Sequence, residues 1–228
     1  MEPEVLPAIL VRTRPELLSR ILLVKDLVRT IQIDVMDNVF VPNKTVGIED
    51  LIGLPPLPKN VRYEFHWMVK NPERWIARID GPSTHIVHVE TIESAEHFAD
   101  IRRTVQASGG KLALALNPET PLENLGPFIK YVKMVLVMTV HPGFSGQKYI
   151  YEMGGKIKAL RSNFPNLDIE VDGGINLETI GHAYSNGANM LAAASAIFSS
   201  VDVPGAIKAL RKAAKSGIQA PVVHDDES

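Results

Sequence analysis

Strand-like apolar runs alternate with helical stretches along almost the whole chain of 228 residues, and this alternation is the feature that most constrains its fold. Eight runs have the length and apolar content of strands: residues 5–10, 30–36, 62–66, 84–89, 111–116, 134–138, 168–172 and 189–193. Helical periodicity is found at 15–28, 95–108, 151–163 and 203–214. The dipeptides Asn71-Pro72 and Thr120-Pro121 are typical of helix starts.

Strands that are each followed by a helical segment indicate a parallel sheet, because parallel neighbours need a crossover connection. In this length they fit a closed (β/α)8 barrel, or TIM barrel, that forms a single domain over residues 1–217. The alternative is an open doubly wound sheet. It is less favoured because Val11-Arg12-Thr13-Arg14-Pro15 stands where a Gly-x-Gly-x-x-Gly turn would follow the first strand. Residues 218–228 are polar and acidic, and we expect a disordered tail.

Composition narrows the class of protein. A net charge of −2 gives no electrostatic case for binding nucleic acid or an anionic membrane. The absence of cysteine excludes disulfides and thiolate chemistry. No apolar run approaches a membrane span, and the acidic N-terminus lacks the pattern of a signal peptide. We therefore expect a soluble cytoplasmic protein.

Polar side chains gather where the predicted strands end, which is the end of a barrel that carries the chemistry. Asp34 ends the second strand on a face that it shares with Gln32 and Met36, because side chains alternate along a strand. A buried carboxylate needs a cation, a donor or a proton. The simpler interpretation is a carboxylate bonded to neighbouring backbone. Further polar residues stand at the ends of later strands: His66, His88, Glu90, Asn117, His141 and Asp172.

Asp34 and Asp172 belong to different strands, so they can approach a substrate from two sides, as proton removal and return require. His66 with the two carboxylates makes a plausible ligand set for Zn²⁺, Mn²⁺, Fe²⁺ or Co²⁺. Such a cation would polarise a carbonyl as the neighbouring proton leaves. The alternatives are two structural ion pairs and a structural histidine.

Glycine-rich turns follow the sixth and seventh predicted strands, at residues 143–147 and 172–174, and Ala194-Ser195 follows the eighth. Glycine lets backbone N–H groups approach an anion, and helix N-termini favour negative charge. Loops at these three places form the usual phosphate site of a barrel. The sequence therefore predicts a phosphate-binding site there.

These segments resemble the ribulose-phosphate 3-epimerase family along nearly the whole chain. The matching motifs are DVMD at 34–37, FVPN at 40–43, HWMV at 66–69, NP at 71–72, HVE at 88–90, LNP at 116–118, TP at 120–121, MTVHPGFSGQ at 138–147 and VDGGI at 171–175. The resemblance implies a ribulose-phosphate-binding barrel that inverts C3 of a ketopentose 5-phosphate through an enediolate. It also implies a divalent metal held by two histidines and two aspartates, and a homo-oligomer, either a dimer or a hexamer.

Carried over by position, the resemblance makes Asp34 and Asp172 the acid/base pair, and Gln32, Asp34, His66 and Asp172 the metal ligands. It places these residues around the substrate: Ala8, Met36, His66, Met68, Met138, Gly143, Phe144, Ser145, Gly146, Gly173, Gly174, Ala194 and Ser195.

The chain departs from the family pattern at the rim. Gln32 stands where the family has a metal-binding histidine, Ala8 replaces a serine, and Asn38 and Ala194 replace glycines. An amide oxygen is a harder and weaker ligand than imidazole, so we expect weaker metal binding. We expect a metal-dependent epimerase that converts ribulose 5-phosphate to xylulose 5-phosphate. Two alternatives stay open: a phosphosugar-binding sensor that has lost the activity, and an epimerase for a ketohexose 6-phosphate.

Overall fold

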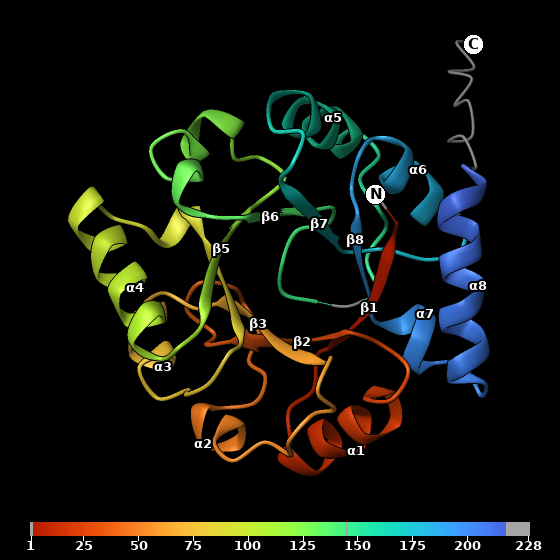
Figure 1. Ribbon diagram of the computed structural model, residues 1–228, viewed down its shortest axis with the longest axis horizontal. Coiled ribbons are helices and arrows are strands. Elements are labelled where there is room, and N and C mark those ends of the chain that lie inside the picture. Colours follow the sequence, from red (N-terminus) through yellow and green to blue (C-terminus); the bar gives the residue numbers. More distant parts are fainter. Residues whose placement is uncertain (1, 145, 218–228) are drawn as a thin grey trace.

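A closed parallel barrel forms the centre of the computed structural model, which describes residues 2–144 and 146–217 (Figure 1). The strands are β1 (Glu4–Ile9), β2 (Thr30–Met36), β3 (Arg62–Met68), β4 (Thr84–His88), β5 (Lys111–Leu116), β6 (Met134–Met138), β7 (Asp168–Asp172) and β8 (Met190–Ala193). Each strand pairs in parallel with the next, and β8 pairs with β1. The predicted barrel is confirmed, and the open sheet is wrong. The predicted tail at 218–228 lies outside the described residues.

Helices surround the barrel on all sides (Figure 1). They are α1 (Arg14–Val24), α2 (Ile48–Leu51), α3 (Pro72–Ile76), α4 (Ala95–Ala107), α5 (Met153–Asn163), α6 (Ile180–Ser185), α7 (Ser195–Phe198) and α8 (Val203–Ser216). Short 3-10 turns lie at η1 (Val89–Thr91), η2 (Leu122–Leu125) and η3 (Ile129–Tyr131). Among the described helices, none is both long and apolar enough to cross a membrane.

Local chemistry sets where the main helices begin. The side chains of Thr13, Ser94 and Asp202 each accept a hydrogen bond from a backbone N–H in the first turn of α1, α4 and α8, as capping residues do. Asn71-Pro72 begins α3 as predicted. One expectation is wrong: α1 ends at Val24 rather than at residue 28. Thr120-Pro121 also precedes a helical segment, but this segment is the single 3-10 turn η2, which ends at Leu125.

Two apolar layers follow from the alternation of side chains along the strands. The outer layer lies between strands and helices, where Ile31, Ile33 and Val35 pack with Leu17 and Ile21 of α1, all fully buried. The inner layer fills the barrel interior with apolar side chains, many of them alanine or methionine: Leu6, Ala8, Ile86, Ala113, Ala115, Met134, Leu136, Met138, Val140, Met190 and Ala192. Polar side chains also point into the barrel interior, and those near the carboxyl ends of the strands form the candidate active site.

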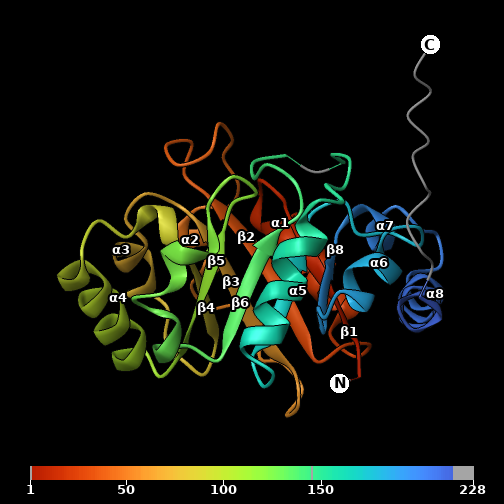
Figure 2. The same ribbon diagram turned by 90° about the horizontal axis from the view of Figure 1, so that it is seen from above.

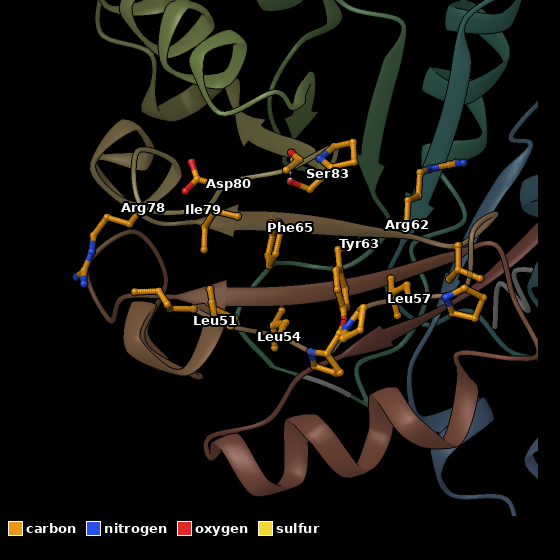
Figure 3. A pocket seen from close by; sticks show the side chains of 18 of the residues that line it. Leu51, Leu54, Leu57, Arg62, Tyr63, Phe65, Arg78, Ile79, Asp80 and Ser83 are labelled. Atoms are coloured by element: carbon orange, nitrogen blue, oxygen red, sulfur yellow. Dashed lines mark hydrogen bonds between the residues drawn. The ribbon is translucent and has the colours of Figure 1, made fainter.

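The outer wall beside β3 is covered by the short helix α2 and the loop that follows it, instead of by a long helix. A cavity of about 510 Å³ remains there, lined by Leu54, Leu57, Tyr63, Phe65 and neighbouring residues (Figure 3). The Tyr63 hydroxyl donates to Pro55 O at 2.8 Å and fixes the loop across the opening. This cavity shares no residue with the cavity at the carboxyl ends of the strands.

Candidate active site

The loops after β2 and β6 rise from the same end of the barrel, the carboxyl end of its strands (Figure 2). Three side chains converge at this end. Asp34 and His66 are register partners on β2 and β3, and Asp172 comes from β7. Their ligand atoms all lie within 4.8 Å of one another. His66 Nδ1 is 3.2 Å from Asp34 Oδ1 and 3.4 Å from Asp172 Oδ2. The structure thus brings together the residues that the sequence proposed as acid, base and metal ligands.

Gln32 precedes Asp34 by two residues on the same face of β2, and its side chain contacts the carboxylates of both Asp34 and Asp172. Its Nε2 donates to Asp34 Oδ1 at 2.8 Å and to Asp172 Oδ2 at 2.6 Å, and it is 3.4 Å from His66 Nδ1. Its Oε1 is buried and has no partner among the described residues. The sequence pointed to the amide oxygen as a ligand, whereas the amide nitrogen faces the cluster, because two carboxylates attract a donor.

The charges of the cluster depend on one another. Burial, followed by the negative charge of Asp172, raises the pKa of Asp34 above its usual value, against the bonds from His66 and Gln32. Burial acts to lower the pKa of His66, but hydrogen bonds and charge from Asp172 and Asp34 outweigh it and raise that pKa to about 9. Without a metal, the His66 ring is therefore an imidazolium between two carboxylates. A cation that binds there must displace this proton.

A second histidine fixes the orientation of the first. His66 Nε2 is 2.9 Å from His88 Nε2, and the two rings stack with centroids 5.1 Å apart. His88 Nδ1 is 3.1 Å from Glu90 Oε2. The Glu90 carboxylate can only accept a hydrogen bond, so the hydrogen-bond network places the His88 proton on Nδ1. His88 Nε2 is then free to accept a hydrogen bond from His66 Nε2. This arrangement turns His66 Nδ1 toward the carboxylates, where a metal ligand is needed.

Glu90 is itself held in place by the loop after β5. Its Oε1 accepts from Asn117 N at 2.7 Å and from the Thr120 hydroxyl. Burial acts to raise the pKa of Glu90, but the bonds and charge of His88, Asn117 and Thr120 prevail and lower it to about 2. Lys156 of α5 donates to three carbonyls of the same loop, at Asn117, Pro118 and Thr120. The sequence placed His88 and Glu90 at the rim but gave them no role, since only their contacts reveal one.

A cavity of about 170 Å³ opens above the two aspartates. The structure brings these predicted substrate-binding residues together around it: Met36, Met68, Met138, Gly143, Phe144, Gly146, Gly173, Gly174, Ala194 and Ser195. Ala8 and His66 are fully buried beneath it and are not part of its wall, and Ser145 lies outside the described residues. The cavity is thus bounded by carboxylates on one side and by glycine-rich backbone on the other.

The glycines after β7 allow the chain to pass very close to its neighbours. Gly173 and Gly174 have φ angles of 117° and 67°, which favour glycine. A Cβ on Gly174 would lie 2.8 Å from Tyr149 N, and one on Gly173 would collide with Val140. None of the described residues that line the cavity is Lys or Arg. A phosphate here would therefore depend on backbone N–H groups, including those at the start of α7 after Ala194.

Two further carboxyl groups lie inside the barrel below the cluster. Glu64 of β3 and Glu170 of β7 are fully buried, and their carboxyl oxygens have no hydrogen-bond partner among the described residues apart from each other. Burial raises the pKa of Glu64 to about 7, and burial with the charge of Glu64 raises that of Glu170 well above its usual value. A proton on one carboxyl lets the pair share a hydrogen bond, so the pair carries less than its full charge at neutral pH.

Comparison with known proteins gives a family match over residues 3–198 to the ribulose-phosphate 3 epimerase family. The chain is 39% identical over 187 residues to the cytoplasmic isoform of ribulose-phosphate 3-epimerase from Oryza sativa subsp. japonica, covering 80% of this chain and 81% of that protein. It is 42% identical over 189 residues to ribulose-phosphate 3-epimerase from Methanocaldococcus jannaschii, covering 80% of this chain and 78% of that protein.

Among solved structures, 3-hexulose-6-phosphate synthase from Salmonella typhimurium superposes with a TM-score of 0.68 and 15% sequence identity. The match covers 94% of this chain and 99% of that one. At this level of identity the likeness concerns the barrel fold alone.

Proposed function

Because the chain belongs to the ribulose-phosphate 3-epimerase family, we propose that it is an isomerase that interconverts ribulose 5-phosphate and xylulose 5-phosphate. One observation supports this proposal above the others: carboxylates from β2 and β7 meet at one cavity, and Gln32 Nε2 lies within 2.8 Å of both. Two carboxylates on different strands can serve opposite faces of one carbon atom.

The chemistry assigned to these carboxylates is a pair of proton transfers. One of Asp34 and Asp172 removes the proton from C3 of the ketose, which leaves an enediolate, and the other delivers a proton to the opposite face. Burial and the charge of Asp172 raise the pKa of Asp34, and this direction favours a carboxyl group that must both take and give a proton. Met36, Met68 and Met138 line the cavity beside these carboxylates and exclude water from the reacting carbon.

A divalent cation fits the residues present. Asp34, His66 and Asp172 offer three ligand atoms, which is the number that open catalytic sites often have, and Gln32 Oε1 is a buried acceptor without a partner among the described residues. When bound, the cation supplies positive charge against the oxygens on C2 and C3. Zn²⁺, Fe²⁺, Mn²⁺ and Co²⁺ all suit a set of imidazole and carboxylates.

The phosphate is assigned to the glycine-rich side of the cavity, at Gly143, Gly146, Gly173, Gly174 and Ser195. Phe144 is 54% exposed at the entrance and lines the same cavity, so it is placed to cover a bound sugar.

The experiment that tests this function is deuterium uptake at C3 of ribulose 5-phosphate in D₂O, with protein stripped by a chelator and then supplied with Zn²⁺, Mn²⁺, Fe²⁺ or Co²⁺. Exchange that appears with metal, together with xylulose 5-phosphate, supports the proposal. Exchange of equal rate without metal contradicts the assigned role of the cation. No exchange under any condition contradicts the proposed activity.

Two other functions are distinguished by the same protein sample. Gln32 in place of a histidine favours a sensor, which would bind ribulose 5-phosphate tightly, retain no metal and show no exchange. Ala8, which is buried beneath the cavity rather than at the rim, and Asn38 in the loop after β2 favour a larger sugar, for which exchange at C3 would be faster with a ketohexose 6-phosphate. Direct comparison of the two sugars separates these cases.

We further assign the protein to the cytoplasm and to a homo-oligomer, either a dimer or a hexamer. The relative named a cytoplasmic isoform supports the first assignment. The exposed side chains of the neighbouring Leu22 and Leu23 on α1 are consistent with the second, because burial of apolar side chains against another subunit is favourable. Sedimentation of the purified protein measures the oligomeric state.

A further inference from the structure

The amide of Gln32 faces the carboxylates with the end that cannot bind a metal. An amide nitrogen is only a donor, and its two N–H groups meet Asp34 Oδ1 at 2.8 Å and Asp172 Oδ2 at 2.6 Å. These two oxygens lie 3.2 and 3.4 Å from His66 Nδ1, so these three atoms are the ones placed to surround a cation at the cluster. Bound cation and inward-facing N–H groups therefore exclude each other.

A half-turn of the amide removes this conflict without moving the rest of the side chain. The turn exchanges Oε1 and Nε2, and the terminal torsion of glutamine has a broad, nearly two-fold profile. Oε1 would then stand 2.6 to 2.8 Å from the same carboxylate oxygens. Oxygen atoms that bind one divalent cation would lie roughly 3 to 3.4 Å apart, so a small outward movement of the side chain would give Oε1 the spacing of a fellow ligand.

The barrel interior supplies acceptors for the nitrogen after the turn. Among described residues, the buried side-chain atoms without a partner belong to Gln32, Glu64 and Glu170, apart from Asn117 Oδ1. Glu64 is the register partner of Gln32 on the next strand, so the two side chains enter the barrel at one level. In the present orientation Gln32 Oε1 meets no donor from the described residues at this level. The N–H groups of a turned amide would face the level of Glu64 and Glu170, whose carboxyl oxygens can accept even while the pair shares one proton.

We propose that the side-chain amide of Gln32 rotates by a half-turn when a divalent cation binds at the site. Without the cation, its N–H groups bridge Asp34 and Asp172. With the cation, Oε1 becomes a ligand beside Asp34, His66 and Asp172. This inference rests on the proposed function only in expecting a cation at this cluster. It makes Gln32 both a competitor of the cation and its fourth ligand. The cation is therefore held more weakly than it would be by a histidine at the same position.

The test follows the Gln32 amide directly by NMR, in protein labelled with ¹⁵N at glutamine and titrated with Zn²⁺, which is diamagnetic. The chain has only Gln106, Gln147 and Gln219 besides Gln32, and the Gln32 signals are those that vanish in Gln32→Met. Without Zn²⁺ they should exchange slowly with solvent and show the shift of protons bonded to carboxylates. With Zn²⁺ they should move, while those of Gln106, exposed on α4, should stay in place. Gln32 signals that are unchanged at saturating Zn²⁺ would overturn the proposal.

Zn²⁺ affinity, measured by competition with a chromogenic chelator, tests the oxygen as a ligand. Gln32→Met removes the oxygen with little change in size and should weaken binding about tenfold or more. Gln32→Glu keeps an oxygen at this place without N–H groups, and Gln32→His supplies an imidazole; both should bind Zn²⁺ more tightly than the wild type. Because Gln32→Met also removes the competing N–H groups, the decisive comparison is with Gln32→Glu and Gln32→His: binding by these two that is no tighter than binding by Gln32→Met would contradict ligation at this place. Circular dichroism of each variant establishes that it folds.

Neither measurement requires turnover. A Gln32 amide that responds to Zn²⁺ in a protein without epimerase activity leaves the inference standing and removes the proposed function. If the protein is an active epimerase but its Gln32 amide signals do not change with Zn²⁺, the proposed function stands and this inference is contradicted.

Discussion

The two faces of β2 differ in almost every physical respect, although their residues alternate along one strand. Ile31, Ile33 and Val35 face the helices and are fully buried among apolar side chains. Gln32 and Asp34 face the barrel interior and are equally buried, but they are bonded to polar groups from β3 and β7. Burial by itself therefore does not distinguish core from site. The partners of each buried group do.

Two buried histidines make the same point. His85 lies on the outer face of β4, where it accepts from Trp67 Nε1 and contacts Ser83 Oγ, and burial lowers its pKa to about 4. His66 lies on the inner face of β3, and its two carboxylate partners raise its pKa to about 9 despite burial. The outer histidine is thus neutral and structural, and the inner one is charged until a cation replaces its proton.

The largest effect is expected from the inner face, at Asp172→Asn. If Asp172 has the proposed roles, this change removes a proton-transfer group and one negative ligand, so turnover of ribulose 5-phosphate should fall about 10⁴-fold or more, with little change in melting temperature. Steady-state kinetics and calorimetry measure the two quantities. Asp168→Asn, at the opposite end of the same strand, is the control and should retain activity. Near-normal turnover by Asp172→Asn would contradict its role.

The outer face should respond in the opposite way. Ile33→Ala leaves a cavity in a fully buried part of the outer layer, and it should lower the free energy of unfolding by about 3 kcal/mol. The turnover number of the folded enzyme should change less than about twofold. Urea unfolding and kinetics below the midpoint measure both, with Ile33→Val expected to cost about 1 kcal/mol. A large loss of turnover at full folding would show that the two faces are not independent.

Glu64→Gln tests the buried carboxyl pair through pH. The folded protein binds the Glu64 proton more tightly than the unfolded chain, because its pKa rises from 4.5 to about 7. The unfolding free energy should therefore fall as pH rises from about 4.5 and level off above about 7, by roughly 3 kcal/mol in all. The amide in the Glu64→Gln variant has no proton to lose in this range, so the variant should lack this part of the fall. Urea unfolding of chelator-treated protein between about pH 5 and about pH 8 compares the two proteins, and parallel profiles would contradict the shift.

A smaller effect is expected at Glu90→Gln, which keeps the shape of the side chain but removes the charge that orients His88. Metal ligands oriented less firmly bind more weakly, so Zn²⁺ affinity should fall about 10- to 100-fold. Competition with a chelator measures this affinity. Glu93→Gln, an exposed change in the same connection, should have no effect. Unaltered Zn²⁺ binding by Glu90→Gln would show that His88 needs no carboxylate to position His66.

Much of the fold was predictable because strands and helices repeat in a regular order. All eight strands occur within a few residues of their predicted places, and the ends of the strands bring Asp34, His66 and Asp172 together. Alternation along β2 also indicated correctly which side chains share a face. These features depend on local pattern and on the symmetry of a closed barrel.

The contacts that orient the site could not be predicted in the same way. The direction of the Gln32 amide depends on Asp172, which comes from the far side of the barrel. The role of His88 depends on Glu90 and on a loop held by Lys156. The short α2 and the cavity beside β3 depend on how prolines at 55, 56 and 58 interrupt a helical connection, which periodicity alone does not reveal.

The bond from Gln32 to Asp172 spans 140 residues of sequence, and this has a consequence for how the protein is made. Contacts of such long range form late, because loop closure must precede them. A ribosome that has released only the first half of the chain exposes Asp34 and His66 on β2 and β3 without their partner. Cation-binding capacity should therefore emerge only after β7 and β8 close the barrel. It would report completed folding in a way that helix content, which accumulates from α1 onward, does not.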